Sequence, residues 1–178
     1  MKNRKQLIYG FLGIILINII GSYFYKRFDL TQDQRYSLSN AAKETIATIN
    51  IPIFIDVFLE GDLPSEFKRL QVETKQILEE FEAYNPNVKF KFVNPSEEKG
   101  AIESLMKFGA KPAQIEIQQN GKTSIQQVFP WAIASFNGDY IKISLLKNQL
   151  GVSSEERINN SVQNLEYAFA DAFNQLIQ

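Results

Sequence analysis

The sequence contains neither cysteine nor histidine. Without cysteine there are no disulfide bonds, no thiol nucleophile and no thiolate metal site. Without histidine the chain lacks the commonest general base and the usual zinc ligand. It also has no G-x-x-x-x-G-K-[ST] phosphate loop and no G-x-G-x-x-G dinucleotide turn. We therefore expect a protein that is not an enzyme and has no catalytic residue, no cofactor and no metal ion.

The chain also has no excess of basic residues over acidic ones. The chain has 19 Lys and Arg against 20 Asp and Glu, a formal net charge of −1. Residues 1–27 hold five of the basic residues and no acidic one, which leaves 14 against 20 in residues 28–178. A surface this acidic argues against nucleic acid as a partner.

The basic residues near the N-terminus flank one long apolar run, LIYGFLGIILINIIGSYF (7–24). At 1.5 Å per residue a helix of this length spans roughly 27 Å, close to the hydrocarbon thickness of about 30 Å. A cleaved signal peptide and a buried core helix are the alternatives. The run lacks a good small-x-small cleavage site and is apolar on all faces, which favours a single-pass anchor within residues 1–27. The positive-inside rule weakly favours a cytoplasmic N-terminus.

The anchor contains residues suited to helix packing. Gly10 and Gly13 permit close approach of a neighbouring helix, and Asn18 is a polar residue within the run. We take these three as candidate partner-binding residues. Trp131, the only tryptophan, is the fourth, because tryptophan is enriched at binding hot spots, although such a residue is more often part of a core.

Residues 28–50 are predicted to form a juxtamembrane connector and a short helix, about 39–49, capped by Ser37 or Ser39. The α/β domain then covers residues 51–178. Residues 51–60 are apolar on both faces, which predicts a strand of a parallel sheet covered on both sides. A long helix follows from Pro64 to about residue 83, with its apolar positions at helical spacing: Phe67, Leu70, Thr74, Ile77, Leu78 and Phe81.

The next segments alternate strands and helices. Residues 88–94 alternate apolar residues with lysines, as in a half-covered strand near the edge of a sheet. A shorter helix, about 97–108, ends at Gly109. The pairs Asn120-Gly121 and Asn137-Gly138 then separate three runs, 114–119, 124–136 and 140–146. Because Asn-Gly favours hairpin turns, these runs predict a three-stranded antiparallel meander, with a bulge or an edge at Pro130.

A final helix begins at Ser153 or Ser154, and its apolar seam predicts packing onto a sheet, or alternatively a coiled coil. The order of the domain, β-α-β-α-β-β-β-α, is that of a thioredoxin-like α/β fold. Pro112 then precedes the third strand, where that fold often carries a cis-proline. A Rossmann-like sheet is the rival, and it lacks the glycine-rich turn.

Paired carboxylates are the remaining candidates for chemistry, at Glu79-Glu80, Glu97-Glu98 and Glu155-Glu156. Neighbouring residues of a helix point in different directions, so we interpret the pairs as solvated charges. Asp56, in the first strand, is expected to be wetted by a loop or paired with a lysine. Its spacing to Glu60 and Asp62 matches no calcium loop.

The sequence resembles the gliding-motility-associated ABC transporter components of the GldG family and the wider ABC-transporter auxiliary family. The resemblance covers nearly the whole chain and depends on several segments in order: DLT (29–31), RYSLS (35–39), VFLEG (57–61), FKRL (67–70), FVNP (92–95), VFPW (128–131) and NLEYA (164–168). Such proteins are accessory subunits of the bacterial inner (cytoplasmic) membrane. Their soluble part is periplasmic, and they act with a separate permease subunit and its ATPase in gliding motility and linked secretion.

The resemblance also implies that this sequence corresponds to the N-terminal portion of a longer protein with a second α/β domain. The expected partners are the ABC permease subunit and its ATPase, other gliding or secretion proteins, and membrane lipid. The alternative function is an extracytoplasmic solute- or peptide-binding module of an ABC transporter. An apolar cleft with convergent polar groups would favour this alternative, whereas a flat exposed patch would favour an accessory subunit.

Overall fold

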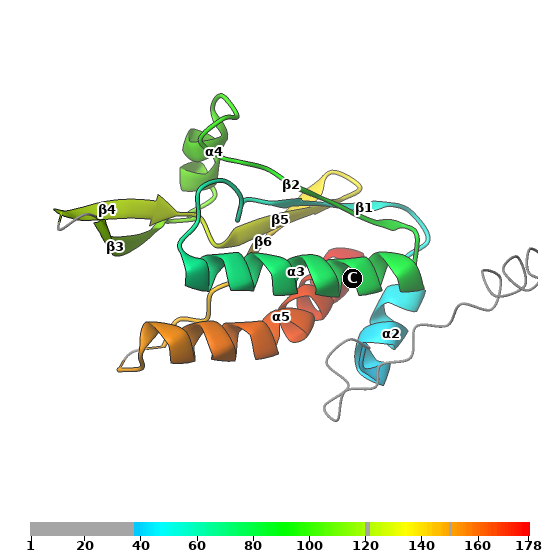
Figure 1. Ribbon diagram of the computed structural model, residues 1–178. Coiled ribbons are helices and arrows are strands. Elements are labelled where there is room, and N and C mark those ends of the chain that lie inside the picture. Colours follow the sequence, from blue (N-terminus) through cyan, green and yellow to red (C-terminus); the bar gives the residue numbers. More distant parts are fainter. Residues whose placement is uncertain (1–37, 120–121, 150) are drawn as a thin grey trace, which may run out of the picture. The chain divides into compact units, whose positions relative to one another are not determined.

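The computed structural model describes residues 38–119, 122–149 and 151–178 (Figure 1). The predicted anchor, with Gly10, Gly13 and Asn18, lies outside the described residues, as does the connector up to residue 37. Within the described ranges, no helix combines the length and the apolar character needed to cross a bilayer.

The described chain is a mixed α/β structure of four helices and six strands. In chain order the elements are α2 (Asn40–Ala47), β1 (Ile53–Val57), α3 (Ser65–Tyr84), β2 (Val88–Phe92), α4 (Ala101–Lys107), β3 (Ala113–Gln119), β4 (Lys122–Val128), β5 (Trp131–Phe136), β6 (Asp139–Ser144) and α5 (Ser154–Ile177). Compared with the predicted order, there is one additional strand.

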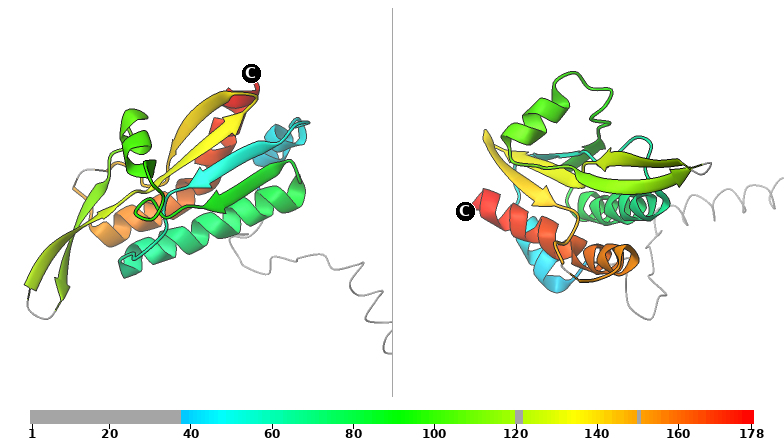
Figure 2. Two further views of the ribbon diagram at one scale, coloured as in Figure 1. Left: turned by 90° about the horizontal axis from the view of Figure 1, so that it is seen from above. Right: turned by 90° about the vertical axis from the view of Figure 1, so that its left-hand side faces the viewer.

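Four of the strands form one sheet in the order β2-β1-β5-β6. β1 and β2 are parallel, with Ile53 opposite Val88, whereas β5 is antiparallel to both β1 and β6. β2 lies at an edge of this sheet, as its alternating sequence predicts. β3 and β4 pair only with each other, as a separate two-stranded hairpin (Figure 2).

Local sequence signals account for the helix boundaries. The side chain of Ser39 accepts a hydrogen bond from the Ala42 amide at 3.2 Å, and Ser153 accepts one from the Glu156 amide at 3.1 Å. Both predicted caps are therefore confirmed for α2 and α5. Pro64 precedes α3 directly, and Gly109 follows the C-cap of α4 with a positive φ of 71°.

The larger hydrophobic core lies on the face of the sheet covered by α3 and α5 (Figure 1). The predicted face of α3 is confirmed, because Phe67, Leu70, Thr74, Leu78 and Phe81 are buried and Ile77 is partly buried against the same core. α5 buries its apolar side against this sheet and α3, so packing onto a sheet is its role in this chain. The short helix α2 contributes to the same core through Leu38, Ala42, Ile46 and Ile49.

A smaller core lies on the opposite face of the sheet, beneath α4 (Figure 2). Its buried residues are Phe58, Val93, Ala101, Leu105, Ala110 and Phe129, with Trp131 and Ile133 packed against them. Trp131 and Ile133 alternate along β5 with Ala132 and Ala134, which belong to the larger core. The sheet therefore has a core on each face, but α4 has only seven residues.

The predicted three-stranded meander is wrong. The run 124–136 is divided at Phe129-Pro130 into β4 and β5, which belong to different sheets. Pro130 cannot donate a backbone hydrogen bond, and its carbonyl accepts one from the Leu145 amide at 2.9 Å. The turn at Asn137-Gly138 is as predicted, with positive φ angles of 52° and 95°.

This division also changes the position assigned to Pro112. Pro112 precedes the hairpin strand β3 and not the third strand of the four-stranded sheet. The strand that occupies that place is β5, and the proline before it is Pro130. The described residues contain no cis peptide bond.

Candidate functional site

One half of the sheet face that carries α4 is exposed to solvent. In β1, Ile53, Ile55 and Val57 point into the larger core, whereas Phe54 points to the other face and is 57% exposed. The prediction that this strand is covered on both sides is therefore wrong at Phe54. The physical reason is the length of α4, about 10 Å at 1.5 Å per residue, which covers only the end of the face near Phe58.

The register of the strands places a second aromatic residue beside Phe54. Phe54 is opposite Ser135, and Ser135 is opposite Tyr140, which is 62% exposed. We call this surface the open face, formed by Phe54, Asp56, Ile133, Ser135, Tyr140 and Lys142. Phe108, at the end of α4, borders it with its ring centroid 6.3 Å from that of Tyr140. The face is thus an aromatic surface continuous with the exposed end of a helix.

Two lysines, on β2 and β6, lie at the open face. Lys91 of β2 lies 3.5 Å from the Asp56 carboxylate, and both side chains are largely exposed, so the pair confirms the expected lysine partner of Asp56. The Lys142 ammonium donates to the Gly109 carbonyl at 3.0 Å. Among the described strand positions of the open face, Asp56 is the only acidic residue. Lys91 and Lys142 together outnumber Asp56 by one, so this surface has a small excess of positive charge, in contrast to the acidic soluble part as a whole.

Trp131, the predicted partner-binding residue, lies at the covered end of this sheet face. Its indole N–H donates to the Lys111 carbonyl at 2.7 Å, and the Lys142 ammonium lies 4.9 Å from the centroid of its ring. The half-buried ring also packs against the smaller core. These contacts hold α4 and β6 together at one end of the open face, while Phe54 and Tyr140 are the more exposed aromatic residues.

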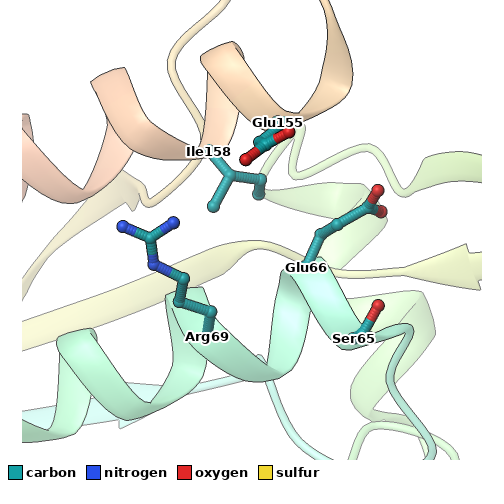
Figure 3. A pocket seen from close by; sticks show the side chains of 5 residues that line it. All are labelled: Ser65, Glu66, Arg69, Glu155 and Ile158. Atoms are coloured by element: carbon teal, nitrogen blue, oxygen red, sulfur yellow. The ribbon is translucent and has the colours of Figure 1, made fainter.

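A hollow of about 240 Å³ lies between the first turns of α3 and α5 (Figure 3). Its lining residues are Ser65, Glu66, Arg69, Glu155 and Ile158. In Figure 3 the Arg69 and Glu66 side chains both rise from α3 and diverge from each other, on opposite sides of Ile158. The hollow is smaller than the 300–1,000 Å³ typical of ligand pockets and has one apolar side chain among its lining residues.

A second hollow, of about 410 Å³, lies between α2 and α5. Polar residues dominate its lining, among them Ser39, Glu166 and Asp171, and the Glu166 carboxylate already accepts a hydrogen bond from the Ser39 amide at 3.0 Å. Its volume suits a small ligand, but the hollow is open to solvent. Neither hollow is an enclosed pocket.

The paired carboxylates lie apart from one another in the structure. Glu79 pairs with Lys75 at 3.9 Å, Glu97 accepts from Asn94 at 2.7 Å, and Glu155 and Glu156 lie in the first turn of α5. Across the described ranges, no three acidic side chains come together in a way that could hold a metal ion.

The sequence did not single out Phe54, Phe108 or Tyr140. The alternation of β1 assigns Phe54 to a face, but it does not show how much of that face a helix covers. Tyr140 follows the Asn137-Gly138 turn, so its neighbour Ser135 could be read from hairpin register. The pairing of β5 with β1, which brings Phe54 and Tyr140 to one surface, joins segments about 80 residues apart and has no local signal.

Comparison with known proteins gives one match. The family described as "Domain of unknown function (DUF7088)" matches residues 32–135, which is more than half of the chain and includes β1 to β4 and nearly all of β5. Neither a curated protein nor a solved structure matches the sequence. On the basis of the family match, this chain belongs to the DUF7088 family.

Proposed function

We propose that this chain is a non-enzymatic, membrane-anchored accessory subunit of an ABC-type transporter complex, associated with gliding motility and linked secretion. The proposal places it in the bacterial inner membrane by a single N-terminal span, with its soluble domain in the periplasm. There it contacts an ABC permease subunit with its ATPase, membrane lipid and other proteins of the machinery. The ordered segments shared with the GldG family support this assignment.

The domain is proposed to be a thioredoxin-like fold with an inserted hairpin. The four-stranded sheet has the order β2-β1-β5-β6, with one parallel and two antiparallel pairs, and α5 follows its last strand. Removing β3 and β4 leaves the order β-α-β-α-β-β-α after α2. The fold is an analogy of architecture only, because a chain without cysteine cannot perform thiol chemistry.

The observation that carries the accessory-subunit proposal is the open face. Two large aromatic side chains, Phe54 and Tyr140, are more than half exposed on the surface of the sheet. Exposed apolar patches of this kind mark protein–protein contacts, whereas a solute-binding module needs a concave apolar pocket. The two hollows described above are open to solvent rather than enclosed, which gives such a module little support.

The test is purification of the full chain from native membranes, with identification of the proteins that co-purify. An ABC permease subunit and its ATPase are the expected result. A second preparation carries an unrelated span of equal length in place of residues 7–24. Loss of the permease in that preparation would place the contact on the anchor, and its retention would place it on the soluble domain.

Two outcomes would overturn the proposal. Absence of any transporter subunit from the native preparation would remove the accessory role. Specific, saturable binding of a small solute to the chain would favour the alternative, a solute- or peptide-binding module.

A further inference from the structure

We infer that the open face is the docking site for an amphipathic helix of a partner protein, whose apolar side is flanked by carboxylates. The inference rests on the proposed function, because it takes the partner to be another protein of the transporter complex. It goes beyond that function by stating which surface binds the partner, and that the bound segment is a helix with acidic flanks.

The spacing of the aromatic residues suits a helix. Phe54 on β1 and Tyr140 on β6 are two strands apart, which is roughly 10 Å at a strand separation of about 4.8 Å. Between them lies the small side chain of Ser135 on β5. An α-helix with its side chains is about 10–12 Å across, so one helix can rest over Ser135 and contact both rings.

An extended peptide is a poorer fit. β1 and β5 lie in the interior of the sheet, where each is paired on both sides, so their backbone groups are not free to bind an added strand. Contacts on the open face therefore have to come from side chains. An amphipathic helix presents its apolar side chains along one side, which is the arrangement that α4 already uses at the other end of the same sheet face.

The charge of the surface selects the flanks of that helix. Lys91, Asp56, Ile133 and Lys142 follow one another across the four strands, so a lysine lies at each end of this row. The ion pair between Lys91 and Asp56 is exposed, and such pairs contribute little to stability. Lys91 can therefore exchange Asp56 for a partner's carboxylate at little cost. A second copy of this chain would instead bring like charges together.

The experiment uses the full chain in native membranes. A benzophenone amino acid is placed at Phe54 or at Tyr140, and for the control at Tyr167, which is 68% exposed on α5. After illumination, the cross-linked peptides are identified by mass spectrometry. We expect Phe54 and Tyr140 to cross-link to the same segment of another protein, with apolar residues at helical spacing flanked by Asp or Glu, and Tyr167 not to reach this segment.

Charge reversal supplies the second measurement. Lys91→Glu is expected to lower the cross-link yield at Tyr140 at least about fivefold, which corresponds to roughly 1 kcal/mol. Lys68→Glu, at an exposed position of α3, is the matched control and should leave the yield unchanged. Changing an acidic residue of the cross-linked segment to lysine should restore the yield with Lys91→Glu. Circular dichroism confirms that both variants are folded.

Several results would overturn the inference. The first is a cross-link to lipid, to another copy of this chain or to a segment without the amphipathic acidic pattern. The second is an absence of cross-links, and the third is an equal effect of Lys91→Glu and Lys68→Glu on the yield. A failure of this inference can be distinguished from a failure of the proposed function. Co-purification of the permease without such a cross-link leaves the accessory role intact, and a cross-link to an acidic helix of a protein outside any transporter leaves the docking site intact.

Discussion

At the residue scale, Phe81 shows how strongly a single side chain can contribute to the larger core. It is fully buried in α3, with its ring centroid 6.3 Å from that of Phe169 and 5.2 Å from that of Phe173. Both contacts are edge-to-face, the geometry that aromatic rings prefer. The helical spacing of the sequence predicts the burial of Phe81, but its two ring partners come from α5, about 90 residues later.

Phe81→Ala is expected to lower the free energy of unfolding by about 3–5 kcal/mol, because it leaves a cavity between α3 and α5. Lys75→Ala, on the exposed side of the same helix, should change it by less than about 0.5 kcal/mol, since its ion pair with Glu79 is exposed and 3.9 Å long. Urea denaturation of the purified variants measures both values. Equal effects would contradict the assignment of the buried face.

Asn85 is a buried polar residue that joins two helix ends. Its side-chain amide donates to the Ile46 carbonyl at 2.6 Å and to the Ile49 carbonyl at 3.0 Å, and its side-chain oxygen accepts from the Asn87 amide at 2.9 Å. Ile46 lies in the last turn of α2 and Ile49 just after it, and their carbonyls also accept from the Ile49 amide at 3.2 Å and from the Asn87 side chain at 3.1 Å. Asn85 therefore adds a second donor to each of these carbonyls.

Asn85→Ala should lower the free energy of unfolding by about 1–3 kcal/mol, because two buried hydrogen bonds between Asn85 and the end of α2 are lost. Asn85→Asp should cost more, since it replaces the donor with a charge that faces those carbonyl oxygens. The same denaturation assay ranks the two variants. A milder effect of Asp than of Ala would show that the side chain does not donate to α2.

At the element scale, helix ends follow local chemistry closely. The cap at Ser153 is one hydrogen bond from its side chain to the Glu156 amide, whereas the neighbouring Ser154 is exposed within the first turn. Ser153→Ala is expected to lower the free energy of unfolding by about 1 kcal/mol. Ser154→Ala should stay within about 0.5 kcal/mol of the unsubstituted chain. If thermal unfolding ranked the two in reverse order, α5 would have to begin one residue later.

Strand boundaries depend on more than local pattern. Residues 124–136 contain no turn signal except Pro130, yet β4 and β5 enter different sheets on either side of Phe129-Pro130. A proline identifies a defect in a strand, but not whether the chain bulges or leaves the sheet. The Trp131 carbonyl accepts from the Phe58 amide at 2.8 Å, which continues the pairing of β5 with β1. The pairing of β5 with β1 therefore decides that the chain leaves one sheet and enters the other at Pro130. This pairing joins segments that are distant in the sequence.

At the scale of the whole molecule, the anchor remains a prediction from sequence. Ile15→Arg, in the middle of the apolar run, is expected to cost roughly 2.5–3.5 kcal/mol of insertion free energy and to release the chain from membranes. The unsubstituted chain should stay in the membrane fraction after a carbonate wash, and immunoblots of both fractions compare the two. A chain whose N-terminus begins near Ser22 would instead indicate a cleaved signal peptide.

The sequence by itself determined the elements that depend on neighbouring residues. The face of α3, the caps of α2 and α5, the parallel βαβ unit and the Asn137-Gly138 turn all follow from periodicity or backbone preference, which act over a few residues. Only the tertiary structure decided the exclusion of β3 and β4 from the main sheet and the exposure of Phe54 beside Tyr140. The separate hairpin and the exposed Phe54 depend on which distant strands pair and on how much of the sheet the short helix α4 covers. The free energy of these contacts comes from residues far apart in the sequence, so no single segment determines it.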